Sequence, residues 1–244
     1  MTPGQPRVAA VIPTLNEAET IAGVIAAIPA GAVDEVIVVD GGSTDGTVAA
    51  ARGGGARVVS AGRGYGRACR AGAAAAADCD IVVFLDGDAS DAPEEIPLLL
   101  GPIAAGTADF VVGSRTRGPR EMGSMAAHQR LAGQAIGAAL YLLYGVRYSD
   151  MGPMRAIRRE ALARLGMREM SYGWNLEMQM RAARAGLRIV EVPVAHRRRA
   201  GGVSKVSGSV SGTIKAGSRI VLTLCRVALE RRRRPIPGAM PARR

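Results

Sequence analysis

Aromatic residues, cysteine and histidine are all scarce in this chain of 244 residues. Phe, Trp and Tyr make up 3% of it, and there are three cysteines and two histidines. The cysteines (Cys69, Cys79 and Cys225) are scattered and form no C-x-x-C pair, which excludes a disulfide scaffold, argues against a zinc site and indicates a reducing compartment. The N-terminus lacks the apolar stretch of a secretion signal, so we expect a cytoplasmic protein.

Acidic residues are nearly absent from the last fifth of the chain. Residues 1–195 carry 19 Lys and Arg against 20 Asp and Glu, whereas residues 196–244 carry 13 against a single acid, Glu230. The formal net charge of +11 therefore lies in the tail. A basic tail binds the phosphates of nucleic acid, of anionic lipid or of a substrate, or it is simply a solvated end. Without interleaved aromatics or a recognition module, we do not expect nucleic acid to be the partner.

Apolar runs long enough to cross a membrane are also missing. Residues 131–146 contain only one strongly polar residue, Gln134, but a membrane helix needs about 20 residues. Residues 209–229 are interrupted by Lys215, Arg219 and Arg226. We expect the first stretch to be a buried or interfacial helix. Residues 209–244 are predicted to be a basic, partly helical segment that follows the main domain (1–208) and can contact an anionic membrane peripherally.

The chain does contain a regular alternation of short apolar runs and helical patterns. Strands are predicted at 8–12, 36–39, 57–59, 81–85, 110–112 and 188–192, and helices at 16–28, 45–51, 66–77, 93–103, 128–144, 159–165 and 174–185. Continuous apolar strands that alternate with helices indicate a single-domain α/β fold. Its sheet should be mainly parallel and Rossmann-like, with helices on both faces.

Polar residues gather where three predicted strands end. These segments are Pro13-Thr-Leu-Asn-Glu17, Asp40-Gly-Gly-Ser-Thr-Asp45 and Asp86-Gly-Asp88. Ligands of parallel α/β sheets bind beyond such carboxyl ends. Two carboxylates one residue apart suit Mg²⁺ or Mn²⁺ on substrate phosphates, although Asp-Gly-Asp is also ordinary turn chemistry. The chain has no G-x-G-x-x-G after its first strand and no P-loop lysine, which argues against classical dinucleotide binding and P-loop hydrolysis.

A glycine-rich basic loop precedes the third predicted helix. In Arg63-Gly-Tyr-Gly-Arg67, backbone amides at the helix start can face an anion, and Arg63 is therefore a candidate binding residue. The alternative is a simple turn in which the glycines only supply left-handed conformations.

The three motifs at the strand ends resemble, in this order, those of the inverting glycosyltransferases of family 2, which have the GT-A fold. The similarity continues through Val111-Val-Gly-Ser-Arg115, residues 150–155 and residues 186–205, so it covers nearly the whole chain. Within the family, the chain resembles the polyprenyl-phosphate enzymes, such as dolichol-phosphate mannose synthases. It departs from them at Met151-Gly-Pro-Met-Arg155, where Ser-Gly-Phe-Arg is common, and at Asp91, where His is frequent.

The resemblance implies a role for each matched residue. The nucleotide base and ribose would be contacted by Pro13, Asn16, Glu17 and Asp40. The divalent metal, Mg²⁺ or Mn²⁺, would be bound by Asp86 and Asp88, with Ser90 beside them. Asp88 would also be a catalytic residue. The phosphates of the substrates would be bound by Arg115, Arg199 and Lys205. Asp150 and Glu177 are candidate general bases for a hydroxyl acceptor, whereas an acceptor phosphate needs none. A loop or cap acid remains the alternative for Asp150, and a helix-surface acid for Glu177.

We therefore expect a metal-dependent inverting glycosyltransferase, which moves a sugar from a UDP- or GDP-type donor to a polyprenyl phosphate. Transfer to a hydroxyl of a soluble glycan or small molecule is the main alternative. A nucleotidyltransferase is less favoured, because it should carry a basic glycine-rich loop directly after the first strand. A non-catalytic binding module that keeps the fold is the remaining possibility.

Overall fold

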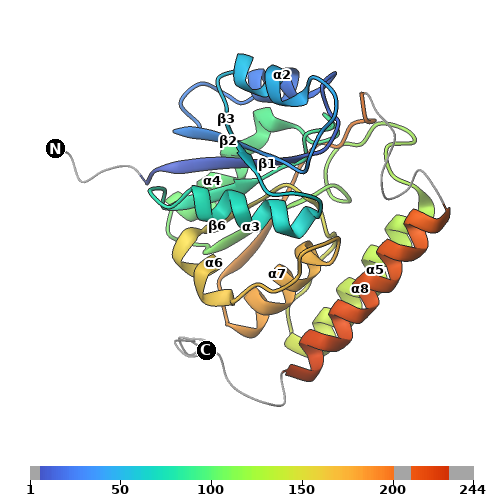
Figure 1. Ribbon diagram of the computed structural model, residues 1–244. Helices are drawn as coiled ribbons and strands as arrows, with labels where there is room; N and C mark the ends of the chain where they lie inside the picture. Colours follow the sequence, from blue (N-terminus) through green and yellow to red (C-terminus); the bar gives the residue numbers. More distant parts are fainter. Residues whose placement is uncertain (1–5, 201–209, 231–244) are drawn as a thin grey trace.

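Seven strands form one sheet in the computed structural model, which describes residues 6–200 and 210–230 (Figure 1). They are β1 (Val8–Thr14), β2 (Glu35–Asp40), β3 (Arg57–Ser60), β4 (Ile81–Phe84), β5 (Phe110–Ser114), β6 (Arg155–Arg158) and β7 (Ile189–Pro193). Their order across the sheet is β3-β2-β1-β4-β6-β5-β7. Only β6 runs antiparallel to its neighbours, so the expected mainly parallel sheet is confirmed.

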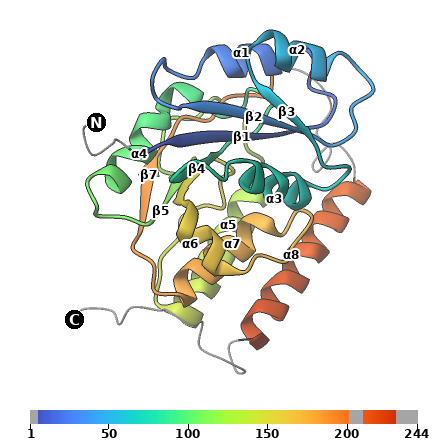
Figure 2. The same ribbon diagram turned by 60° about the vertical axis from the view of Figure 1, so that its left-hand side comes forward.

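Helices cover both faces of this sheet (Figure 2). They are α1 (Ile21–Ala26), α2 (Thr47–Gly53), α3 (Tyr65–Ala75), α4 (Ile96–Ala104) after the 3₁₀ turn η1 (Pro93–Glu95), α5 (Ala127–Tyr144), α6 (Arg159–Leu165), α7 (Trp174–Arg184) and α8 (Val210–Glu230). The helices α1, α2 and α4 pack on one face, and α3, α6 and α7 on the other. The predicted α/β fold with helices on both faces is therefore present.

The alternation of side chains along the central strands builds two hydrophobic layers. In β1, Ala9 and Val11 face the layer under α3 and α7, whereas Ala10 and Ile12 face the layer under α1 and α4. Gly72 lets α3 lie close to the sheet, because a Cβ atom there would collide with the side chain of Val11. The rigid sheet and its helices thus hold the strand ends, and the loops that follow them, in fixed positions.

One local prediction was wrong, and one strand was not predicted. The helix expected from residue 16 begins at Ile21, because Asn16 has a φ of 53° and the left-handed conformation cannot start a right-handed helix. Strand β6 was not predicted, since arginines at both its ends break the apolar run. Arg155 is nevertheless fully buried, and it donates hydrogen bonds to the carbonyl oxygens of Pro153 and Asn175.

The helix α8 packs against α7, and both α5 and α8 carry exposed apolar side chains. Residues 131–146, which were expected to form a buried or interfacial helix, include both buried and exposed apolar side chains. Leu140 of α5 is fully buried, whereas Leu131 and Leu142 are exposed. In the described part of the chain, no helix has the length and hydropathy needed to cross a membrane. The predicted boundary at 208/209 adjoins residues outside the described ranges and stays a prediction.

Candidate active site at the carboxyl ends of β1, β2 and β4

The loops that follow β1 and β2 are bound to each other by their polar residues. The backbone N–H of Asn16 donates to the hydroxyl of Ser43 at 2.9 Å, and the Asn16 side-chain oxygen accepts from the backbone N–H of Thr44 at 2.9 Å. The buried carboxylate of Asp40 accepts from the N–H groups of Gly42 and Ser43. Pro13 lies in β1 opposite Val39. These predicted nucleotide residues therefore line one continuous, hydrogen-bonded rim of the sheet.

Three carboxylates gather after β4. The backbone N–H of Asp86 donates to Asp91 at 3.0 Å, and Asp88 accepts from the N–H of Ser90 at 2.9 Å. Asp88 and Asp91 are buried. Burial, and then the charges of Asp91 and Asp88, raise the pKa of Asp86 well above its ordinary value. Burial likewise raises the pKa of Asp91 to about 6. Three carboxyl groups thus lie together in a buried place, where a negative charge on one disfavours ionisation of its neighbours.

This donor set fits a divalent cation that is shared with a substrate. Oδ1 of Asp86 and Oδ1 of Asp91 are buried and have no hydrogen-bond partner within the described ranges. Carboxylate oxygens are the ligands that Mg²⁺ and Mn²⁺ prefer. Across residues 6–200 and 210–230, no group of three or more His, Cys, Asp or Glu side chains is already arranged to hold a metal ion. Such a cation would therefore complete its coordination with substrate oxygens and water.

Arg199 lies across this cluster. Its Nη2 atom is 2.5 Å from Oδ2 of Asp88, and its Nη1 atom is 3.3 Å from Oε1 of Glu17. One guanidinium therefore links the ends of β1 and β4, which brings together three of the predicted site residues.

The segment after β7 delivers Arg199 to this position. The N–H of Ala195 donates to the Glu95 carboxylate at 2.7 Å, and the N–H of Arg197 donates to the Ser90 carbonyl at 2.9 Å. A longer contact of 3.4 Å joins the N–H of Ala200 to the Asp88 carbonyl. Residues 195–200 thus run along the loop that carries the carboxylates.

Arg115 and Asp150 form a second charged pair in this region. Nε and Nη2 of Arg115 donate to the two oxygens of Asp150 at 2.8 and 2.9 Å, and the Arg115 backbone N–H donates at 3.0 Å. Burial alone would raise the pKa of Asp150, but the hydrogen bonds and charge of Arg115 lower it below the ordinary value. The geometry makes Asp150 a residue that orients Arg115. Its predicted role as a base stays untested.

Glu177 lies in a buried cluster between α7 and α8. It is fully buried, so the alternative of a helix-surface acid was wrong. It accepts from the backbone N–H groups of Arg168 and Glu169 and from the side chains of Arg181 and Arg226. These contacts join α8 to the body of the protein.

The glycine-rich loop before α3 has a packing role that sequence reasoning missed. A Cβ atom on Gly66 would lie 2.5 Å from the carbonyl oxygen of Glu169, and the N–H of Arg67 donates to the Met170 carbonyl at 3.0 Å. This amide is thus engaged by the protein itself. Arg63 is exposed on the same loop, and its predicted role stays a prediction. Lys205 lies outside the described residues.

Two further residues of the region had no predicted role. Asp91 was noted only as a departure from the family pattern, yet its burial beside Asp86 makes it part of the cluster. His196 is buried, and its Nδ1 atom has no hydrogen-bond partner among the described residues. Burial, with the charge of Arg115, lowers the pKa of His196, so the imidazole is neutral and able to bind a metal. The sequence signals were a third acid in the segment that begins with Asp86, and one of only two histidines in the chain.

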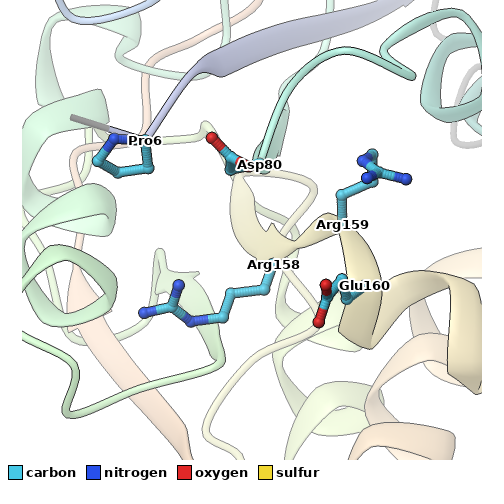
Figure 3. Close-up of a pocket in the computed structure, with 5 residues that line it drawn as sticks. All are labelled: Pro6, Asp80, Arg158, Arg159 and Glu160. Carbon is cyan, nitrogen blue, oxygen red and sulfur yellow. The ribbon is translucent and has the colours of Figure 1, made fainter. Parts of the chain in front are cut away.

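A pocket of about 380 Å³ lies away from this region (Figure 3). It is lined by Pro6, Asp80, Arg158, Arg159 and Glu160, which lie where β1 and β4 begin and β6 ends. Its two arginines donate to the carbonyl oxygens of Ile103 and Cys79. The pocket therefore lies near the amino ends of β1 and β4, whereas the candidate site lies at their carboxyl ends.

Comparison with known proteins gives consistent matches over most of the chain. Residues 9–166 match the family model described as glycosyl transferase family 2. An uncharacterized glycosyltransferase of Mycobacterium tuberculosis (strain ATCC 25618 / H37Rv) is 41% identical over 214 residues, which cover 86% of this chain and 94% of the relative. The undecaprenyl-phosphate mannosyltransferase of Micrococcus luteus is 32% identical over 223 residues, which cover 84% of this chain and 90% of the relative.

A solved structure has the same architecture. Glucosyl-3-phosphoglycerate synthase from Mycobacterium tuberculosis, in complex with Mn²⁺, uridine-diphosphate-glucose and phosphoglyceric acid, superposes with a TM-score of 0.71 at 28% identity. The match covers 91% of this chain and 80% of that protein.

Proposed function

Because the chain belongs to glycosyl transferase family 2, we propose that it is a metal-dependent inverting enzyme that transfers a sugar from a UDP-type donor to a polyprenyl phosphate. Its family and its GT-A fold agree with the resemblance found in the sequence, and it is a nucleotide-sugar-dependent glycosyltransferase. The observation that carries the proposal is the cluster of Asp86, Asp88 and Asp91 beside the loops after β1 and β2.

The donor would lie along the rim formed by Asn16 and Asp40, with its diphosphate toward the cluster. Asp86 and Asp88 are the residues that would hold the divalent cation, with Ser90 and the neutral His196 beside them. The bound cation would neutralise the charge that develops on the leaving nucleoside diphosphate. Arg199 supplies a positive charge beside the same cluster. A related enzyme that binds Mn²⁺ and UDP-glucose supports a UDP-type donor.

The state of the two candidate bases favours an acceptor that is already anionic. Asp150 is held by Arg115 and Glu177 by Arg181 and Arg226, so both carboxylates are already engaged by donors of the protein. A phosphate oxygen attacks the anomeric carbon without prior deprotonation. The undecaprenyl-phosphate mannosyltransferase among the relatives supports the same class of acceptor.

A small phosphorylated molecule with a hydroxyl acceptor is the second candidate. It is favoured by the similarity to glucosyl-3-phosphoglycerate synthase, whose structure contains phosphoglyceric acid. An acceptor of this kind would also carry a phosphate for the arginines near the site. Its attacking hydroxyl would, however, require a base, and the two that the sequence offered are already engaged.

A transfer assay separates these functions. The purified chain is incubated with Mn²⁺ and radiolabelled UDP-glucose, UDP-galactose, UDP-N-acetylglucosamine or GDP-mannose, together with undecaprenyl phosphate in detergent or with 3-phosphoglycerate. We expect label in the organic phase from one UDP-sugar. Label in the aqueous phase with 3-phosphoglycerate would select the second candidate. Full activity in EDTA would refute the metal requirement.

Matched variants test the carboxylate cluster in the same assay. Asp86→Asn and Asp88→Asn should abolish transfer and leave the fold intact. Asp78→Asn is the control, since Asp78 is exposed in the loop before β4, at the other edge of the sheet. Activity in all three variants would exclude the cluster as the site.

We further propose that the enzyme works peripherally at the cytoplasmic face of a membrane. The outer surfaces of α5 and α8 expose Leu142, Val221 and Leu222, and four consecutive arginines begin at Arg231. Exposed apolar side chains near basic ones suit an anionic lipid surface. We expect flotation with phosphatidylglycerol vesicles but not with phosphatidylcholine vesicles, and we expect Leu142→Glu with Leu222→Glu to reduce it. Equal flotation of wild type and double variant would contradict this face as the contact.

A further inference from the structure

Arg199 occupies an atom that the proposed metal site needs. Its Nη2 atom lies 2.5 Å from Oδ2 of Asp88, and the other oxygen of Asp88 accepts from the N–H of Ser90 at 2.9 Å. Both oxygens of Asp88 are therefore engaged. The neighbouring Asp86 and Asp91 each keep one buried oxygen without a hydrogen-bond partner among the described residues. The guanidinium thus pairs directly with one carboxylate of the cluster, Asp88.

Arg199 is also held by a second carboxylate, that of Glu17. Nη1 lies 3.3 Å from Oε1 of Glu17, whose side chain is only 7% exposed. The backbone on either side is attached to the carboxylate loop, through Arg197 N–H to the Ser90 carbonyl and Ala200 N–H to the Asp88 carbonyl. These backbone attachments do not involve the Arg199 side chain, so Asp88 can be released without breaking them.

We infer that Arg199 is an internal counter-ion of the metal site, which holds Asp88 in the protein alone and leaves it when a divalent cation binds together with the donor diphosphate. This inference rests on the proposed function. One oxygen cannot accept from a guanidinium and coordinate a cation in the same position, and the two positive charges repel each other at this distance. A cation alone must therefore compete with Arg199 for Asp88.

The diphosphate removes this competition. Once released from Asp88, the guanidinium remains beside the cluster and exchanges one anionic partner, a carboxylate, for another, a phosphate. The cation and the nucleotide therefore bind with positive coupling, and the coupling passes through one side chain. The coupling is reciprocal, so each ligand must increase the affinity for the other by the same factor.

The experiment measures Mn²⁺ affinity of the full chain by the electron paramagnetic resonance signal of free Mn²⁺, with and without UDP. In Arg199→Ala we expect Mn²⁺ alone to bind about tenfold more tightly than in wild type, which corresponds to about 1.4 kcal/mol. The increase in Mn²⁺ affinity caused by UDP should shrink by about the same factor. Arg199→Ala should thus strengthen the binding of Mn²⁺ alone and weaken the coupling between Mn²⁺ and UDP. A purely structural role of Arg199 would not produce both changes.

Arg197→Ala is the matched control, because Arg197 lies on the same segment but pairs with the exposed Glu94. It should leave both Mn²⁺ affinities unchanged. Arg199→Gln, which keeps more of the side chain, serves if the alanine variant does not fold. Equal or weaker binding of Mn²⁺ alone by the Arg199 variants would overturn the inference and leave the proposed function standing. If wild type binds no Mn²⁺ even with UDP, both are wrong.

Discussion

Glu177 offers the sharpest test of structure against sequence pattern, because the two assign it different roles. The sequence made it a candidate base, whereas the structure makes it an anchor for α8. Its Oε2 atom accepts from the N–H groups of Arg168 at 2.9 Å and Glu169 at 2.6 Å. Its Oε1 atom accepts from Arg181 at 2.9 Å and Arg226 at 3.2 Å. We predict that Glu177→Gln destabilises the fold and spares catalysis.

The magnitude follows from the partners. Glutamine presents one acceptor and one donor where the carboxylate presents two acceptors, so two of the four donors lose their partner. Removing one member of a buried ion pair costs about 3–5 kcal/mol. Part of this is relieved here, because Arg226 is 39% exposed and Arg181 keeps Glu230 at 2.8 Å. We therefore expect a loss of about 2–4 kcal/mol in the free energy of unfolding, or a Tm lower by roughly 10 °C.

The assay combines urea unfolding with kcat, measured at 20 °C, where the variant is still folded. Glu160→Gln is the control, since it removes the same charge from an exposed position of α6. The unfolding midpoint should fall only for Glu177→Gln, and kcat should stay within about twofold of wild type for both. Wild-type stability together with a hundredfold loss of kcat would refute the structural role and restore Glu177 as a base.

Three other substitutions give further tests. Asp150→Asn should lower kcat about a hundredfold, because Arg115 loses its bidentate partner. Since the pKa of Asp150 is lowered in the fold, its stabilisation is present above the ordinary carboxyl pKa and lost as pH falls through the lowered value, so acid unfolding curves should show a smaller pH dependence in the variant. The pKa of Asp91 is raised to about 6, so its contribution to stability is lost as pH rises through that value. Asp91→Asn should therefore gain stability relative to wild type at pH 7 and keep only about half of that advantage at pH 5, in chemical unfolding without metal. Gly72→Ala should destabilise by about 1–3 kcal/mol through its clash with Val11, whereas Gly101→Ala, in open space on α4, should be neutral or stabilising by thermal unfolding.

The sequence predicted the acidic rim because the geometry of a parallel sheet determines it. Continuous apolar runs identified β1, β2 and β4, and their carboxyl ends must meet at one edge, so Asn16, Asp40 and Asp86 could be placed together. Strand β6 was not predicted, because it begins with a charged residue that lies in the core. The guanidinium of this residue, Arg155, donates its hydrogen bonds to backbone carbonyls there. No local pattern distinguishes such a buried arginine from an exposed one.

Contacts between distant parts of the chain could not be predicted in the same way. The role of Glu177 depends on how α8 lies against α7, which is a matter of helix packing. Gly64 and Gly66, at the start of α3, matched an anion-binding loop, but they serve the close approach of the Glu169 and Met170 backbone. Glu17 and Arg199 are 182 residues apart, and the resemblance assigned them separate roles with no contact between them.

The placement of β7 explains why that contact exists. It pairs in parallel with β5 at the edge of the sheet, so the chain leaves its carboxyl end on the side where β1 and β4 also end. Gly113 and Gly118 allow Val194 to pass, since a Cβ atom on either would collide with it. Of the three arginines that follow His196, Arg199 is thereby brought against Glu17 and Asp88, whereas Arg197 pairs with Glu94. The topology thus places a basic residue of the segment after β7 against the acidic end of β4, so a group that would bind the diphosphate contacts a group that would bind the metal.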